Sequence, residues 1–425
     1  MLIFYIFYFS FICFLDMFSL LLFFLSLVFV TLYWFIGRFD GVFFVDFVRL
    51  LLLFVSLWVY LFSILTLKEA SLETFLFWLM LLFTFVRFSV NNIIIFYLSF
   101  EAIFLLIFFY LLGWGKTAER IQASFYMFFY TLGFSLPFLV VLLHLKSYLT
   151  DNFFLSYNPL WGFYPWFIVF LVFIVKLPLF GFHVWLPKAH VEAPVRGSIL
   201  LAGVLLKLGG YGLLRFFPFI SYVRLSFSFL IAFFFYQAVL GALLISFFCV
   251  RQIDLKIIIA YSSVVHIRII FVGLFSQTFL GLKGGVLMIV AHGFVSPLLF
   301  FLMTLYYNFF HSRRNIVIKG LIILCPLSCL LWFIGCLLNL GLPPFMSFFS
   351  EIFIIGSMRF LIELEWLILG ARCFIIGVFC VYMYVSPVHG ERPIPGPFLI
   401  DFKCLIISFL SIFFVLLYPL FFFYF

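Results

Sequence analysis

The chain has 425 residues, of which 68% are hydrophobic and only 9% are charged, with a formal net charge of +9. A soluble globular domain is closer to half apolar and one quarter charged, so this composition excludes that class and predicts an all-α polytopic membrane protein. The basic residues are scattered or lie in short loops such as 311–314, which is typical of membrane-edge anchors and not of a nucleic-acid surface.

Apolar segments of about 20 residues can cross a bilayer as helices. Breaks at charged residues, Gly and Pro predict spans near 17–36, 41–66, 72–90, 92–112, 121–145, 163–186, 198–217, 226–249, 255–275, 282–306, 318–360, 366–388 and 403–424. Segment 2–15 is a further, short candidate. The chain is therefore expected to form about 13–14 transmembrane helices, with no soluble domain and no long linker.

Two of these spans carry proline at a central position. Pro178 interrupts 163–186, and Pro343 and Pro344 interrupt 318–360. Proline removes a backbone hydrogen bond and clashes with the preceding turn. Paired interrupted helices in the two halves of a membrane protein are typical of a transporter built from a structural repeat. A pair of ordinary proline kinks is the alternative.

Six ionisable side chains lie inside apolar stretches long enough to span the membrane: Glu101, Lys176, Lys207, His266, His292 and Glu351. A charge at mid-membrane costs roughly 2.5–3.5 kcal/mol on insertion scales, so six unpaired charges would cost on the order of 10–20 kcal/mol. Titratable groups retained at that cost indicate a function, and groups in series indicate proton transfer. Several are separated by about one or two helix-plus-loop units, which fits a row near mid-membrane.

Glu101 and Lys176 are the natural ion pair among the six. If the carboxylate moved away, the desolvated lysine would release its proton, so the pair could act as a switch. The bland alternatives are a static pair for these two, a snorkelling lysine for Lys207, and an interfacial carboxylate for Glu351. For His266 and His292 the alternative is an ordinary core histidine with satisfied hydrogen bonds.

The sequence offers no pattern for a bound cofactor or metal. The eight cysteines include no Cys-x-x-Cys pair, and there is no dinucleotide-binding glycine pattern, P-loop or haem motif. We expect no redox centre in this chain. Its 74 phenylalanines are consistent with an A/T-rich organellar genome, and the apolar N-terminus has no cleavable signal pattern. Both features favour synthesis inside a mitochondrion.

Segments 186–194 (Leu-Pro-Lys-Ala-His-Val-Glu-Ala-Pro) and 205–212 (Leu-Leu-Lys-Leu-Gly-Gly-Tyr-Gly) resemble subunit 4 of mitochondrial NADH:ubiquinone oxidoreductase, respiratory complex I. Shorter matches at 113–115, 259–263 and 288–293 support the resemblance. It covers about 95–360, whereas both ends are similar only as hydrophobic helices.

The resemblance implies a fold of two inverted five-helix repeats with two discontinuous helices. It assigns 1–90 to N-terminal transmembrane helices, 72–217 to the first antiporter-like repeat, 226–388 to the second and 389–425 to a C-terminal transmembrane helix. It also implies roles for the six groups. Glu101 and Lys176 resemble a switch pair, the next three a central relay (Lys207, His266 and His292), and Glu351 the acidic group on the second broken helix.

Two arginines depart from the family pattern. Arg196 and Arg268 stand where small or apolar residues are usual. A two-residue step rotates a helix by about 200°, so Arg268 is expected to face away from His266 and to reach a neighbouring subunit, a lipid phosphate or the interface. If it faced the relay instead, its charge would disfavour protonated His266.

The function implied by the resemblance is proton translocation by one of three antiporter-like subunits in the membrane arm of a multi-pass complex of the mitochondrial inner membrane. The chain would be a non-redox subunit of the NADH:ubiquinone reductase (translocase), with flavin, iron–sulfur clusters and ubiquinone bound by partner subunits. The expected partners are other membrane-arm subunits, including the two other antiporter-like ones, protons, and membrane lipids such as cardiolipin. The alternatives are a multi-component cation/proton antiporter subunit and a structural membrane scaffold.

Overall fold

The computed structural model describes residues 46–65, 72–115, 118–146, 163–216, 228–276, 278–358, 363–390 and 402–422. The predicted spans 2–15 and 17–36 lie outside these residues. Every predicted span from 41–66 onward contains helix. Across the described ranges the regular secondary structure is helical, apart from isolated bridge residues at Val90, Asp254 and Arg314. The predicted all-α class is therefore confirmed.

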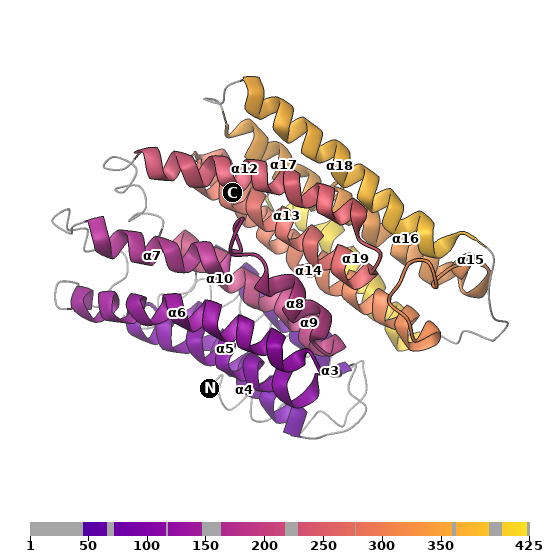
Figure 1. Cartoon of the computed structure of the whole chain (residues 1–425), viewed down its shortest axis with the longest axis horizontal. Coiled ribbons are helices and arrows are strands. Elements are labelled where there is room, and N and C mark those ends of the chain that lie inside the picture. The colour runs from indigo at the N-terminus through magenta and orange to yellow at the C-terminus, as the bar shows by residue number, and fades with distance from the viewer. Residues whose placement is uncertain are drawn as a thin grey trace.

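The first half of the chain forms α3 (Phe47–Leu65), α4 (Leu72–Ser89), α5 (Ile93–Trp114), α6 (Arg120–Lys146), α7 (Phe163–Lys176), α8 (Trp185–Glu192), α9 (Val195–Leu200), the π-helical η1 (Leu201–Leu205) and α10 (Leu206–Arg215). The second half forms α12 (Ser228–Arg251), α13 (Leu255–Phe275), α14 (Phe279–Phe310), α15 (Leu321–Leu324), α16 (Pro326–Leu340), α17 (Met346–Gly356), α18 (Glu363–Val388) and α19 (Phe402–Phe422). The two sets lie side by side with their long helices roughly aligned (Figure 1).

Helix α14 is the centre of the molecule. It packs against α3, α9 and η1 from the first half and against α13, α16 and α17 from the second. The residues of its most apolar 18-residue stretch are all buried, whereas one third of those in the corresponding stretch of α6 are buried. An apolar helix buried on every side is a core helix, and one with an exposed apolar face borders lipid or a partner.

Nine helices of the described part of the chain are long and apolar enough to cross a membrane. Four shorter apolar helices accompany them, at Phe167–Lys176, Pro326–Leu340, Met346–Gly356 and Leu405–Leu416. Three of the four belong to the spans that the sequence predicts to be broken. The short lengths therefore reflect the interruption of a spanning segment.

Both predicted breaks are present. α7 ends at Lys176, and a non-helical turn containing Pro178 precedes α8. α16 ends with Gly341 in the left-handed region at φ 75°, where glycine is favoured, and Pro343 and Pro344 then separate it from α17. The Ser347 hydroxyl donates to the Leu338 carbonyl (2.9 Å) across this second break. Protein groups thus satisfy backbone that the interruption leaves free.

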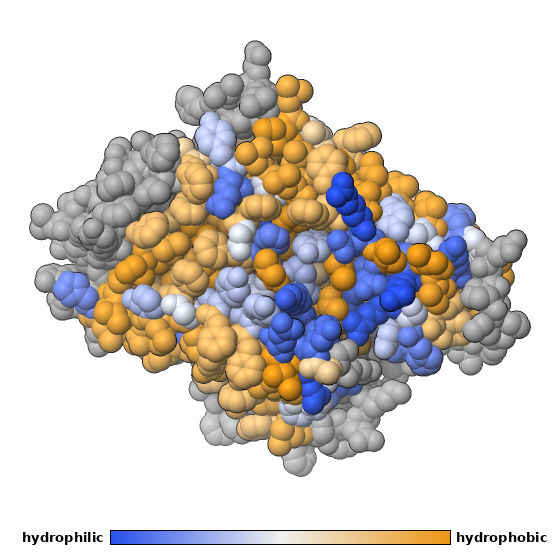
Figure 2. All heavy atoms as spheres, viewed as in Figure 1, coloured by the Kyte–Doolittle hydropathy of each residue, from blue (hydrophilic) through white to orange (hydrophobic). Residues whose placement is uncertain are grey.

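Polar residues collect at one edge of the bundle. In Figure 2 hydrophilic atoms gather near the α8–α9 and α15 end of the face, while most of the remaining described surface is hydrophobic. Exposed charged residues of this region include Lys188, Arg251 and Arg314. A polar rim beside an apolar belt is the surface expected of a membrane-spanning bundle.

Candidate functional site

Glu101 and Lys176 form a buried ion pair, as the sequence predicts. Lys176 Nζ lies 3.2 Å from Glu101 Oε1 and so joins α7 to α5. The Lys176 side chain is 1% exposed and that of Glu101 9%. Removing either partner would leave an uncompensated charge in an apolar interior, which costs several kcal/mol. The pair is therefore strongly coupled.

Two local features stabilise the ammonium. Lys176 is the last residue of α7, where the helix dipole favours a positive charge. Its Nζ lies 3.6 Å from the centroid of the Phe104 ring and 4.1 Å from that of Phe100, which are cation–π distances. One carboxylate and two aromatic faces replace the water that the ammonium has lost.

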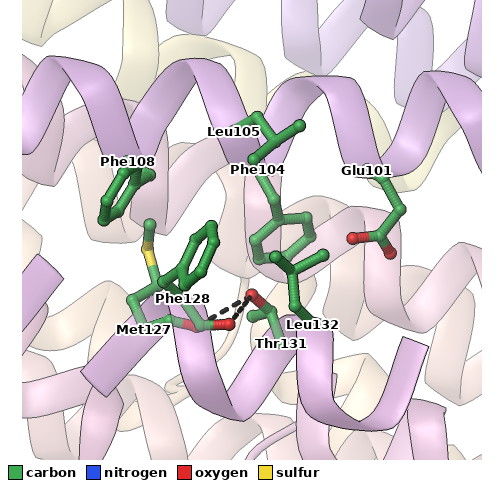
Figure 3. Close-up of a pocket in the computed structure, with 8 residues that line it drawn as sticks. All are labelled: Glu101, Phe104, Leu105, Phe108, Met127, Phe128, Thr131 and Leu132. Carbon is green, nitrogen blue, oxygen red and sulfur yellow. Dashed lines mark hydrogen bonds between the residues drawn. The ribbon is translucent and has the colours of Figure 1, made fainter. Parts of the chain in front are cut away.

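Glu101 also borders a groove between α5 and α6 (Figure 3). Apart from Glu101 the lining is apolar except at Thr131, whose hydroxyl donates to the carbonyls of Met127 (2.8 Å) and Phe128 (3.2 Å). Glu101 Oε2 is buried without a hydrogen-bond partner in the described part of the chain. One carboxylate oxygen is thus occupied by Lys176, and the other can accept a proton.

Lys207 is the second residue of α10, which directly follows the π-helical segment η1, an irregularity that often marks functional sites. Its Nζ donates to the Ala202 carbonyl (2.5 Å) and lies 2.8 Å from His292 Nδ1 on α14. An ammonium can only donate, so His292 Nδ1 presents its lone pair to a charged Lys207. In neutral His292 the proton is therefore on Nε2.

Glycines let these helices approach closely. A Cβ at Gly209 would lie 3.5 Å from the carbonyl carbon of Lys176, and one at Gly293 would lie 3.3 Å from Lys207 Cε. Small residues therefore bring α10 close to both α7 and α14.

His266 links α13 to both halves of the second broken span. Its Nε2 lies 3.1 Å from Asn339 Oδ1 on α16, and its Nδ1 lies 3.9 Å from Glu351 Oε1 on α17. The Asn339 amide nitrogen points to Cys380 Sγ at 3.6 Å, which orients the amide oxygen toward His266. An amide oxygen accepts, so Nε2 carries a proton, and neutral His266 turns its Nδ1 lone pair toward the carboxylate.

The His266 and His292 rings face each other at 5.7 Å between centroids. Glu351 Oε1 in turn accepts a hydrogen bond from Arg372 Nη2 at 3.0 Å, and the Arg372 side chain is completely buried. The guanidinium is permanently charged and provides a counter-charge for the Glu351 carboxylate. Lys207, His292, His266, Glu351 and Arg372 thus form one continuous buried cluster.

The six predicted residues fall into two groups: the Glu101–Lys176 pair and the cluster that begins at Lys207. A small cavity beside Lys207 and His292 is lined mainly by apolar side chains, among them Leu177 and Ile289. Because Leu177 follows Lys176 directly, this cavity lies where the two groups approach each other. Placement supports the predicted row, while the role of each residue in proton transfer stays a prediction.

Sequence reasoning missed three polar groups that contact this site. Asn339 orients His266, Arg372 pairs with Glu351, and Arg87 lies fully buried on α4 near the first pair. The two arginines carry the same signal that singled out the other six, a charge inside an apolar span. Their pairing depends on how the helices are rotated, which the spacing does not reveal.

The two family departures differ in their surroundings: Arg196 has a charged partner, whereas the guanidinium nitrogens of Arg268 have no hydrogen-bond partner in the described part of the chain. Arg196 pairs with Glu73 of α4 (2.5 Å), and Glu73 also accepts a hydrogen bond from Tyr110. Arg268 faces away from the His266 cluster, as predicted, with its guanidinium carbon 5.4 Å from the Phe180 ring centroid. It is 0% exposed, so the expected contact with lipid or the membrane interface is wrong for the chain by itself.

The proline-bounded segment 188–192 is helical, as part of α8. Pro187 falls in the first turn of α8, where its missing N–H costs nothing. His190 is completely buried and stacks on Phe300 with 4.8 Å between ring centroids. Over the described ranges, His, Cys, Asp and Glu form no group of three or more that could hold a metal ion.

Comparisons with known proteins agree with this architecture. Residues 90–400 match the family described as NADH:quinone oxidoreductase/Mrp antiporter, transmembrane. The NADH-ubiquinone oxidoreductase chain 4 of Ceratitis capitata is 39% identical, over 74% of this chain and 70% of that protein. The chain 4 of Carassius auratus is 40% identical, over 76% of this chain and 70% of that protein.

Two solved structures share the fold. A chain of respiratory complex I from Thermus thermophilus with bound NADH aligns with a TM-score of 0.80 at 22% identity, covering 92% of this chain and 88% of that one. A chain of the membrane-bound sulfane sulfur reductase, an archaeal respiratory membrane complex, also gives 0.80 at 21% identity, covering 93% and 86%. The chain therefore belongs to the NADH:quinone oxidoreductase/Mrp antiporter transmembrane family, in the group of NADH-ubiquinone oxidoreductase chain 4.

Proposed function

We infer that this chain is a proton-translocating subunit in the membrane arm of NADH:ubiquinone oxidoreductase. The observation that carries this inference is the continuous buried cluster from Lys207 to Glu351, together with the Glu101–Lys176 pair, in a relative of chain 4. The chain is a multi-pass protein of the mitochondrial inner membrane.

The chain's contribution to the enzyme is transfer of protons without redox chemistry. Flavin, iron–sulfur clusters and ubiquinone belong to partner subunits in this proposal. The direct partners are other membrane-arm subunits, including two further antiporter-like ones. The exposed apolar faces of α6 and α18 can contact such neighbours or lipid. Anionic cardiolipin would bind at a basic edge of the protein.

The first step takes place at the ion pair. While Glu101 Oε1 holds the ammonium, Lys176 keeps its proton. If the carboxylate withdraws, the desolvated ammonium loses its counter-charge and gives up the proton. The π faces of Phe100 and Phe104 alone do not replace a full negative charge. The pair therefore acts as a switch whose state depends on the position of Glu101.

The second step passes a proton from Lys207 to His292. Lys207 Nζ already donates toward the Nδ1 lone pair at 2.8 Å. Transfer of that proton makes His292 cationic, and the ring can then release the Nε2 proton. The entering and leaving protons use different nitrogens, so each transfer leaves His292 with its proton on Nδ1, and the ring must return to the Nε2–H tautomer before the next transfer.

The third step charges His266. The His266 Nε2–H group stays hydrogen-bonded to Asn339 Oδ1. An arriving proton therefore binds at Nδ1, which lies 3.9 Å from Glu351 Oε1. The carboxylate stabilises the resulting imidazolium. Arg372 competes for the same oxygen, so the balance between the two cations sets how firmly the proton is held. His266 is in this scheme the proton store of the second cluster.

The alternatives predict different chemistry. A structural scaffold would tolerate apolar replacement of these groups, and buried charges are an expensive way to join apolar helices. An antiporter subunit would use the same residues, but the relatives at 39–40% identity are NADH-ubiquinone oxidoreductase chains. The oxidoreductase assignment is therefore favoured.

The test is Lys207→Met in the assembled complex, with proton pumping and NADH:ubiquinone electron transfer measured in the same vesicles. Methionine has a side chain of similar length to that of lysine and carries no transferable proton. We expect pumping to fall by about tenfold or more, as for loss of a group in acid–base transfer. Lys283→Met is the matched control, because Lys283 lies on α14 against Phe279. Unchanged pumping in Lys207→Met would support the scaffold.

A further inference from the structure

A third charged group lies beside the Glu101–Lys176 pair and has no part in the steps above. Arg87 lies in the last turn of α4 and is 0% exposed. Its Nη1 donates to the Phe96 carbonyl of α5, whereas Nε and Nη2 are buried without a hydrogen-bond partner in the described part of the chain. A guanidinium stays charged, so its burial with two free donors is costly unless the charge has a use.

Arg87 shares an aromatic ring with Lys176. The guanidinium carbon lies 4.4 Å from the Phe100 ring centroid, and Lys176 Nζ lies 4.1 Å from the same centroid. Glu101 attracts Arg87 electrostatically, and Arg87 repels Lys176. The carboxylate therefore lies in the field of two cations, one of which can lose its proton and one of which cannot.

We propose that Arg87 is a positioning residue for proton transfer at this pair: it keeps Glu101 ionised after Lys176 has become neutral, and it favours release of the Lys176 proton. The inference rests on the proposed function. Without Arg87, each release would leave Glu101 as a buried anion with no counter-charge, which would draw the proton back. With Arg87 the site keeps a cation beside the carboxylate in both states.

Among the described residues, two phenols also interact with this site. Tyr97 of α5 interacts electrostatically with Glu101, and Tyr211 of α10 with Arg87. Neither phenol can supply a positive charge. The charge balance near Glu101 is therefore set by Lys176 and Arg87.

The test is Arg87→Gln in the assembled complex, with protons pumped per NADH oxidised measured from about pH 6 to pH 9. Removing a permanent positive charge makes Glu101 and Lys176 both bind protons more tightly. The pH profile of pumping should move to higher pH by about one unit. This is the lower end of the shift that a nearby charge usually causes. Arg87→Lys should restore the original profile only in part, because a buried ammonium can itself lose its proton. Arg268→Gln is the matched control, since Arg268 is equally buried but faces away from the cluster.

A profile of Arg87→Gln that coincides with that of the unchanged complex would overturn the proposal. Lys176→Ala, measured alongside, separates the two claims. If Lys176→Ala pumps normally, the proposed function fails. If Lys176→Ala does not pump while Arg87→Gln has a normal profile, only the role of Arg87 fails. A second measurement covers poor assembly. Glu101→Gln leaves two unpaired cations, so adding Arg87→Gln should raise the amount of assembled complex. A lower amount in the double variant than in Glu101→Gln would contradict the proposal.

Discussion

The two halves of the molecule hold their buried charges differently. In the first half, Lys176 and Glu101 meet directly at 3.2 Å, in a cage of phenylalanine rings. A second cluster begins at Lys207, on the last helix of the first half, and extends through the second half to Glu351, which is paired with Arg372. One region contains a single charge pair, and the other contains several titratable groups on successive helices.

This difference assigns a distinct task to each region. A pair with one acceptor has two states, bound and separated, and suits a switch. A series of titratable groups suits conduction, since a proton can rest on more than one ring. The mainly apolar cavity near Leu177 lies between the two groups of residues. Variants should therefore behave differently in each half.

The largest effect is expected from Glu101→Gln, which would break the first region. It leaves the Lys176 ammonium buried beside a neutral amide, and loss of one partner of a buried pair costs about 3–5 kcal/mol. We expect less assembled complex, a lower thermal inactivation temperature and no pumping by what remains. Glu119→Gln is the control, because Glu119 is exposed at the start of α6. Equal thermal stability of the two variants would show that the pair is not coupled.

An intermediate effect is expected from His266→Gln, which sharpens the contrast. Glutamine can hydrogen-bond to Asn339 but cannot take up a proton, so the structure should survive while conduction fails. Pumping should fall by about tenfold or more, with assembly near normal. His389→Gln, at an exposed position, is the matched control. Loss of assembly in place of loss of pumping would make His266 a structural residue.

The smallest effect is expected from Asn339→Leu. The change removes the acceptor that keeps the proton on His266 Nε2, and an unsatisfied buried donor costs about 1–3 kcal/mol. The ring then loses its preference for one orientation, and pumping should fall a few-fold with its pH profile broadened. Measurements of protons per NADH across pH would reveal this. A profile identical to that of the unchanged complex would mean that Asn339 does not orient the ring.

Much of this architecture is predictable from the sequence because membranes penalise polarity strongly. Breaks at Pro178 and at Pro343–Pro344 follow from proline chemistry, and both are present. The Glu101–Lys176 contact follows from the cost of leaving either charge alone. Predictability ends where helix rotation decides contacts. Arg372 reaches Glu351 and Asn339 reaches His266 only because α16, α17 and α18 pack in one particular register.

The π-helical η1 was also not predicted. Residues 201–205 have an ordinary apolar helical pattern, and the wider turn positions Ala202 O to accept from Lys207 Nζ. Arg87 and Arg372 carried a signal that could have been used, since each is a charge inside a predicted span. The same cost argument applied to arginine would have found both.

The most direct test of the central claim is the number of protons pumped per NADH oxidised in Lys176→Ala of the assembled complex. The account predicts that this ratio falls while the complex still assembles and transfers electrons, because the switch has lost the group that holds the proton. An unchanged ratio would contradict the account and leave the buried charges as a structural framework.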